Sequence, residues 1–159
     1  MRKSVLVVCS VLLFGSALLA QNKIDTKWHC SKEAALQKMD VGDMAEHSYA
    51  LAQGTCSATA ADKDFEEKSG AFTEFRDLKK TGMTNHGRFL VTMGNGDKVY
   101  YNYSGSAPAD TKKPASNKWT LDSGTGKLKG GKGSGACSGM MNADGSSDWH
   151  CTGTYTSGK

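Results

Sequence analysis

The sequence predicts an all-β protein whose strands form a closed antiparallel barrel. Short runs of β-branched and aromatic residues alternate with glycine- and asparagine-rich turn signals, and almost no segment has the periodicity of a helix. Glycine accounts for 19 of 159 residues, and glycines let barrel strands bend sharply. A β-sandwich is the other architecture that short strands with regular turns allow.

Residues 1–20 have the layout of a secretory signal peptide. Basic residues begin the chain, an apolar stretch covers 5–19, and the small residue Ala20 precedes a polar segment. The apolar stretch is shorter than the ~20 residues that a membrane-spanning helix needs. We therefore expect cleavage after Ala20, or alternatively after Ala17, and a secreted or periplasmic protein; a retained membrane anchor is the other alternative.

Residues 21–159 then form one domain of 139 residues (159 − 20). Without Arg2 and Lys3, the 20 basic residues fall to 18 against 16 acidic ones, a net charge of +2. A nucleic-acid-binding domain would carry a strong basic stripe with aromatic residues, so this balance argues against a nucleic acid partner. No further apolar run in the sequence is long enough to span a membrane.

Four of the five cysteines remain after the signal peptide, an even number in an oxidising compartment. The end of the chain looks like a hairpin in which Gly145 takes the left-handed turn position. Paired residue numbers then sum to 288, which places Cys137 directly opposite Cys151 and within reach of a disulfide. Elimination leaves Cys30 to pair with Cys56.

The remaining elements of the mature chain are assigned from composition. Residues 32–39 favour a helix, but the run is short and a glycine stops it, so we expect a loop or a single helical turn. Residues 47–58 are predicted to form a strand, and 60–69 a solvated loop or a strand edge. Residues 106–117, which include both prolines, are predicted to form a linker before a strand resumes at 119–121.

The clearest element is a hairpin that turns at Asn95 and Gly96. An Asn-Gly pair between β-type runs is the strongest short-range hairpin signal. With these two residues as the turn, paired numbers sum to 191 and Arg88 faces Tyr103.

This register puts the candidate ligand-binding residues on one sheet face: His86, Arg88, Tyr101 and Tyr103. If that face points into the mouth of a barrel, it offers a cationic and aromatic lining for a carboxylate-bearing or phenolic ligand. If it points outward, Arg88 and Tyr103 form an ordinary exposed pair.

No residue set in the sequence predicts a catalytic site. Glu74 and Asp77 lie on a neighbouring strand candidate, but on opposite faces, and so make a poor carboxylate pair for acid–base catalysis. The chain contains serine, histidine and aspartate, but no nucleophile-elbow motif.

The triplet Trp-His-Cys occurs at 28–30 and again at 149–151, and two histidines with two cysteines would make a zinc set. Neighbouring side chains in a strand point to opposite faces, so the His and Cys of one triplet cannot reach the same ion. We therefore expect no metal site. The hairpin register predicts instead that Trp149 covers Gly139 beside a disulfide.

Residues 124–133 are rich in glycine and invite comparison with a phosphate-binding loop. Gly126 and Gly131-Lys132 have the spacing of a Walker motif, but Gly133 stands where a hydroxyl would bind magnesium. No helix pattern follows the segment. We therefore expect no nucleotide and no other cofactor.

The same segment resembles a motif of the plant dirigent proteins, of which the related allene oxide cyclases have a looser version. The motif is Gly-Thr-Gly, any residue, Phe, two variable residues and Ala-Arg-Gly. Residues 124–126 match its start, Leu128 stands at the Phe position, and 131–133 stand at Ala-Arg-Gly. From about Trp28 onward, the chain also resembles a group of secreted bacterial proteins of uncharacterised function.

The resemblance implies an antiparallel barrel of about eight strands, of the allene oxide cyclase/dirigent type. The glycines of the segment would make a tight turn at the barrel end, and Leu128 would plug the interior. The catalytic residues of either family do not align with this sequence residue by residue, so the resemblance implies a fold and not an activity.

The sequence thus supports an exported barrel that binds a small ligand, partly apolar or anionic, or that acts as a surface interaction module. A cyclase- or isomerase-like enzyme acting through a barrel cavity is the alternative that the fold resemblance permits. The residues leave open whether the protein is an enzyme, which molecule it binds and its oligomeric state.

Overall fold

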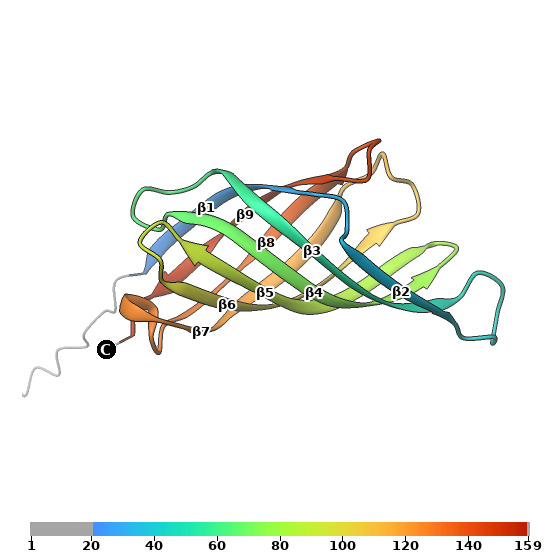
Figure 1. Ribbon diagram of the computed structural model, residues 1–159, viewed down its shortest axis with the longest axis horizontal. Coiled ribbons are helices and arrows are strands. Elements are labelled where there is room, and N and C mark those ends of the chain that lie inside the picture. The colour runs from blue at the N-terminus through green and yellow to red at the C-terminus, as the bar shows by residue number, and fades with distance from the viewer. Residues whose placement is uncertain (1–20, 159) are drawn as a thin grey trace, which may run out of the picture.

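The computed structural model describes residues 21–158 and consists almost wholly of β-strands (Figure 1). The strands are β1 (Asn22–Cys30), β2 (Ala35–Asp40), β3 (Ser48–Ala60), β4 (Glu67–Lys79), β5 (Gly82–Met93), β6 (Lys98–Pro108), β7 (Ala115–Gly124), β8 (Lys132–Met141) and β9 (Ser147–Thr156). A short 3-10 helix, η1 (Gly126–Leu128), follows β7. The predicted signal peptide, with Cys9, lies outside the described residues.

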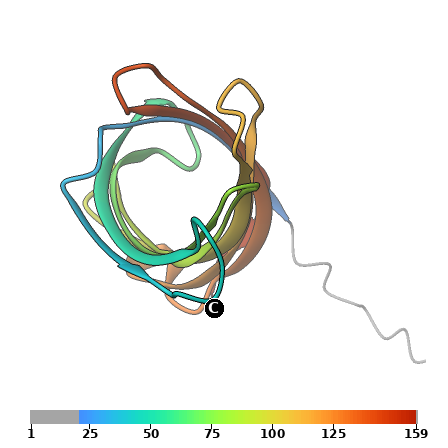
Figure 2. The same cartoon turned by 90° about the vertical axis from the view of Figure 1, so that its right-hand side faces the viewer.

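Eight of the nine strands close into an antiparallel barrel, as Figure 2 shows along its axis. The strand order is β1-β9-β8-β7-β6-β5-β4-β3, and a β1–β3 pairing closes the ring. The ninth strand, β2, pairs with the first half of β3, whereas β1 pairs with its second half. The prediction of an all-β antiparallel barrel is confirmed. Within residues 21–158, no helix is long and apolar enough to cross a membrane.

Both disulfides have the predicted connectivity and join directly opposite residues. Cys137 pairs with Cys151 across β8 and β9, in the register whose residue numbers sum to 288. Cys30 pairs with Cys56 across β1 and β3, at the pairing that closes the barrel. Gly145 has φ +86°, the left-handed conformation that this hairpin turn requires.

Three predictions of local structure are wrong. Residues 32–39 form no helical turn, because 35–40 make the added strand β2 along β3, and tertiary pairing outweighs a weak helix preference. The linker predicted over 106–117 spans only 109–114, since β6 runs through Pro108 and β7 begins at Ala115.

The third error concerns the register of the β5–β6 hairpin. Arg88 lies opposite Asn102 rather than Tyr103, so paired numbers sum to 190 and not 191. The two-residue turns favoured in hairpins, types I′ and II′, both need a positive φ at Asn95, but only Gly96 has one, at +88°. The loop takes three residues, and a slip of one residue moves one strand's side chains to the other face.

One end of the barrel is closed by apolar side chains. Phe65, in the β3–β4 loop, stacks on Tyr155 with ring centroids 4.3 Å apart, and both are buried. Leu128 of η1 is also buried in the core cluster, which confirms that it plugs the interior. The β4–β5, β6–β7 and β8–β9 connections lie at the opposite end, which forms the mouth (Figure 1).

Candidate functional site

The barrel lumen contains a cavity with a volume of about 140 Å³. All three tryptophans, Trp28, Trp119 and Trp149, line it together with two phenylalanines and two tyrosines, and the lining extends to Glu33 and Ala107 at the mouth. An engineered apolar cavity of about 150 Å³ in another protein binds benzene. The lumen therefore has the size for a ring-shaped group and the aromatic wall that small-molecule sites commonly have.

Glu74 is the centre of a polar cluster on this wall. Strand β4 carries Glu74 and Arg76 two residues apart on its inner face, and Glu74 is 6% exposed. The Arg76 Nε donates to Glu74 Oε1 at 2.5 Å. Asn85 Nδ2, from β5, and the Tyr103 hydroxyl, from β6, donate to Oε2 at 2.6 and 2.8 Å. Donors therefore surround the Glu74 carboxylate.

Ion pairs stabilise the charged forms of the residues in this cluster. The Arg76 Nη1 lies 2.5 Å from Glu33 Oε1, so the loop after β1 is tied to the mouth of the barrel. Burial works against the charged form of Arg76, but the Glu74 and Glu33 carboxylates raise its pKa above the ordinary value. Burial, followed by the Glu74 charge, raises the pKa of Tyr103, which keeps its hydroxyl a donor.

A second carboxyl lies deeper in the lumen. Glu67 is 4% exposed and accepts a hydrogen bond from the Tyr101 hydroxyl at 2.8 Å. Burial raises the pKa of Glu67, and the neighbouring hydroxyls of Thr26 and Tyr101 only partly oppose that shift. A carboxyl of this kind keeps its proton to a higher pH than an exposed glutamate, and can therefore deliver it to a bound molecule as a general acid.

Two buried polar atoms of the cavity wall have no hydrogen-bond partner within residues 21–158: Asn85 Oδ1 and Trp119 Nε1. Because Asn85 Nδ2 donates to Glu74, the free atom of this amide is the oxygen, an acceptor. The indole Nε1 of Trp119 is a donor. A buried polar atom without a partner costs about 1–3 kcal/mol, so an occupant that reaches either atom with a matching group gains a hydrogen bond that the wall does not supply.

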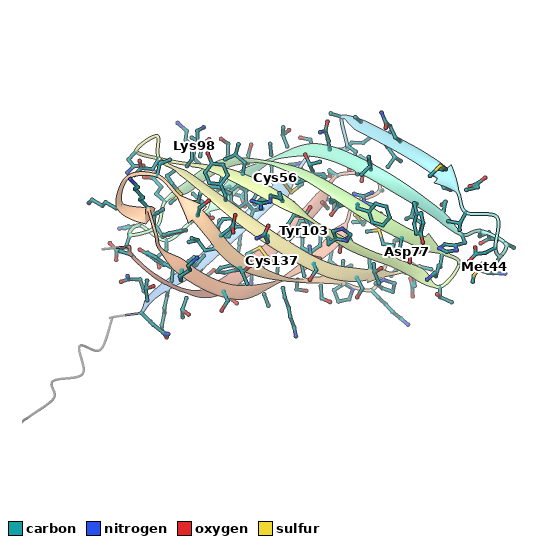
Figure 3. The ribbon with its side chains drawn as sticks, turned by 90° about the horizontal axis from the view of Figure 1, so that it is seen from below. Met44, Cys56, Asp77, Lys98, Tyr103 and Cys137 are labelled. Carbon is teal, nitrogen blue, oxygen red and sulfur yellow. A yellow bond between two sulfur atoms is a disulfide. The ribbon has the colours of Figure 1, made fainter. Side chains whose placement is uncertain are left out.

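The four candidate ligand-binding residues do not share a face. Tyr101 and Tyr103 line the cavity, and Tyr103 lies midway along the barrel (Figure 3). His86 and Arg88 are exposed on the outer wall, where Arg88 pairs with Asp122 at 2.8 Å. The physical reason is the shifted β5–β6 register, which turns the β5 residues away from the two tyrosines.

Four polar residues of the lumen were not predicted from the sequence: Glu67, Glu74, Arg76 and Asn85. The prediction that Glu74 and Asp77 lie on opposite faces is correct, but it says nothing about Arg76 on the same face as Glu74. The neighbouring strand β3 carries a sequence signal for large inward side chains on β4. Small residues on the inner face of β3 lie opposite the large side chains of β4: Ala50 opposite Arg76, Ala52 opposite Glu74, and Gly54 opposite Phe72.

The two Trp-His-Cys triplets divide between the faces as strand alternation predicts. The tryptophans and cysteines line the lumen, and all four cysteines form disulfides. The histidines point outward, with His29 2.8 Å from Asp148 and His150 2.8 Å from Asp25. Trp149 packs on Gly139, where an added Cβ would lie 2.3 Å from the indole, so the predicted packing is confirmed.

Comparison with known proteins agrees with this architecture. No protein-family model matches the chain, and no curated protein sequence does. Among solved structures, the pterocarpan synthase dirigent protein PsPTS1 is similar, with a TM-score of 0.52 and 10% identity over 88% of this chain and 97% of that one. GePTS1, another pterocarpan synthase dirigent protein, has a TM-score of 0.51 and 8% identity over 99% of this chain and 100% of its own. The chain therefore has a barrel fold resembling that of dirigent proteins.

Proposed function

We propose that this chain is an exported barrel protein that binds a small, largely apolar molecule in its lumen. The observation that carries the proposal is a pair of polar atoms in the cavity wall, Asn85 Oδ1 and Trp119 Nε1, that have no hydrogen-bond partner within residues 21–158. Such atoms destabilise an empty site, and a ligand that supplies the missing hydrogen-bond partners removes this cost on binding. The two disulfides suit an oxidising compartment and support the export part of the proposal.

A calorimetric titration with toluene, a neutral molecule with one aromatic ring, tests the lumen as the binding site. We expect toluene to bind the native protein, and binding to fall at least tenfold in Ala107→Phe, which fills the mouth from its lining. Ala136→Phe is the matched control, because Ala136 is exposed on the outer face of β8. Equal binding by both variants would place toluene outside the lumen and contradict the proposal.

A cyclase- or isomerase-like enzyme is the second candidate, and Glu67 is the observation that favours it. A buried carboxyl with a raised pKa, paired with Tyr101 and lining the cavity, is the kind of group that acts as a general acid on a bound molecule. The test is to incubate lumen-bound compounds with the native protein and with Glu67→Gln, and to compare the recovered molecules by mass spectrometry and chromatography. Rearrangement only by the native protein supports an enzyme; unchanged compounds in both leave binding as the function.

A further inference from the structure

The cavity wall carries an excess of negative charge. Within residues 21–158, the lining contains three carboxyl side chains, Glu33, Glu67 and Glu74, and one guanidinium, Arg76. Arg76 lies 2.5 Å from both Glu33 and Glu74, so its charge is already balanced by carboxylates of the wall. Even with Glu67 protonated, two carboxylates face one guanidinium. A poorly solvated space of this kind attracts cations and repels anions.

The free hydrogen-bonding atom of this cluster is an acceptor. Asn85 is 9% exposed, and its Nδ2 is held by Glu74 Oε2 at 2.6 Å, which fixes the amide with Oδ1 unpartnered. The Glu74 carboxylate already accepts hydrogen bonds at both oxygens. A group that reaches the Asn85 oxygen beside this carboxylate therefore needs an N–H or O–H donor to satisfy it.

The aromatic rings of the wall add a second attraction for positive charge. Tyr103 lies beside Asn85, since both donate to the same oxygen of Glu74. Trp119, opposite Tyr103 on β7, continues the aromatic wall. The faces of such rings carry negative potential and attract ammonium groups, most strongly where water is excluded.

We propose that the lumen selects protonated amines with a compact aromatic or aliphatic body, an assignment that rests on the proposed ligand-binding function. The ammonium group donates to Asn85 Oδ1 within the field of Glu74, and the body packs among the tryptophans. The Arg88 side chain, which would favour an anionic ligand, lies on the outer wall and plays no part.

Three probes with one body and different head groups test the charge: 2-phenylethylamine, 2-phenylethanol and 3-phenylpropionate. All three tryptophans line the cavity, so intrinsic fluorescence of the purified protein, checked by calorimetry, reports occupancy. We expect the amine to bind at least tenfold more tightly than the alcohol, and the carboxylate more weakly than both. An amine-to-alcohol ratio below tenfold, or tighter binding of the carboxylate, overturns the amine assignment and leaves lumen binding intact. If none of the three binds, and toluene does not bind either, both proposals fail.

Charge variants assign the selectivity to the cluster. Glu74→Gln removes one negative charge while keeping an acceptor for Asn85 and Tyr103, and should lower the amine-to-alcohol ratio at least fivefold. Glu33→Gln removes one negative charge at the mouth. It is the variant to use if Glu74→Gln fails to fold, as judged by circular dichroism. Asp122→Asn is the matched control, because it removes the same charge from the outer wall, and its ratio should stay within twofold of native. An unchanged ratio in whichever glutamate variant folds would contradict the amine assignment.

Discussion

Trp28 lies directly opposite Trp149 across the β1–β9 pair. Each tryptophan opens one of the two Trp-His-Cys triplets, and the antiparallel pairing brings both to the inner face of the wall. Trp28 meets Phe89 edge to face, with ring centroids 5.0 Å apart, whereas Trp149 covers Gly139. The repeated triplet thus marks where the first and last strands meet, with a disulfide beginning two residues beyond each tryptophan.

The disulfide connectivity predicts a specific peptide map. Trypsin cuts after Lys27, Lys32, Lys38, Lys63 and Lys132. Without reduction, we expect peptide 28–32 linked to peptide 39–63, through Cys30 and Cys56, and peptide 133–159 lighter by two hydrogens through its internal bond. Reduction should separate the first pair and restore the mass of the last peptide. A linkage between 28–32 and 133–159 would contradict the register of β8 and β9.

Glycines under Trp119 predict a steep cost for side chains on the inner wall of β8. A Cβ at Gly135 would lie 2.4 Å from Trp119 Cζ2 and 2.0 Å from the Thr152 carbonyl oxygen, so Gly135→Val overpacks the site. We expect a loss of about 1–3 kcal/mol in the free energy of unfolding, measured with urea. Ala136→Val is the control on the outer face of the same strand, where the change should stay within about 0.5 kcal/mol. Equal stability of the two variants would mean that Trp119 does not pack there.

The fold could be predicted from the sequence because its signals are local. Gly145 and the cysteine spacing determine the β8–β9 register within one hairpin. At the Asn95-Gly96 turn the same reasoning gave the wrong register. An Asn-Gly pair fits both a two-residue and a three-residue loop, and the choice depends on the φ angle of Asn95, which the sequence does not determine. Strand β2 was not predicted, because its residues have a weak helix preference that pairing with the next strand, β3, outweighs.

The candidate site was harder to predict than the fold, because it depends on the relative register of several strands. Glu74, Asn85 and Tyr103 come from three strands and meet at one carboxylate. A shift of one residue in the β5–β6 register would turn Asn85 outward and bring Arg88 to the lumen. Sequence alternation alone therefore identifies the pair of tyrosines but not their partners.

Glu67 predicts an unusual pH dependence. Burial raises the pKa of its carboxyl in the folded state above the unfolded value of about 4.3. Its contribution to stability is therefore fully present below pH ~4 and is lost as the pH rises through the folded pKa. Glu67→Gln stays neutral throughout, so we expect this variant to gain stability over native as the pH rises from ~4 to ~8. The measurement is urea unfolding across that range, with Glu66→Gln, the exposed neighbour, as the control. A difference that does not vary with pH would contradict the buried placement.

The β2–β3 connection should show the opposite pH dependence, with stability lost as the pH falls. His47 is 6% exposed and lies between two carboxylates, with Nδ1 2.5 Å from Asp43 and Nε2 2.9 Å from Asp77. The hydrogen bond from His47 lowers the pKa of Asp43 below its ordinary value. A lowered carboxyl pKa stabilises the folded state above the unfolded value of about 3.9, and this contribution is lost as the pH falls through the folded pKa.

Asp43→Asn should therefore loosen this connection near pH 6, and its effect should shrink as the pH falls below the unfolded value of about 3.9. Hydrogen exchange of the amides in β2 and the first half of β3 measures the effect, because β2 has no other strand partner among residues 21–158. Asp40→Asn removes the same charge from the exposed end of β2 and should leave exchange close to native. Faster exchange in both variants would attribute the effect to net charge and contradict the prediction. Faster exchange in Asp43→Asn alone, and only above pH ~4, would show that the hydrogen bond to His47 holds β2 on the barrel.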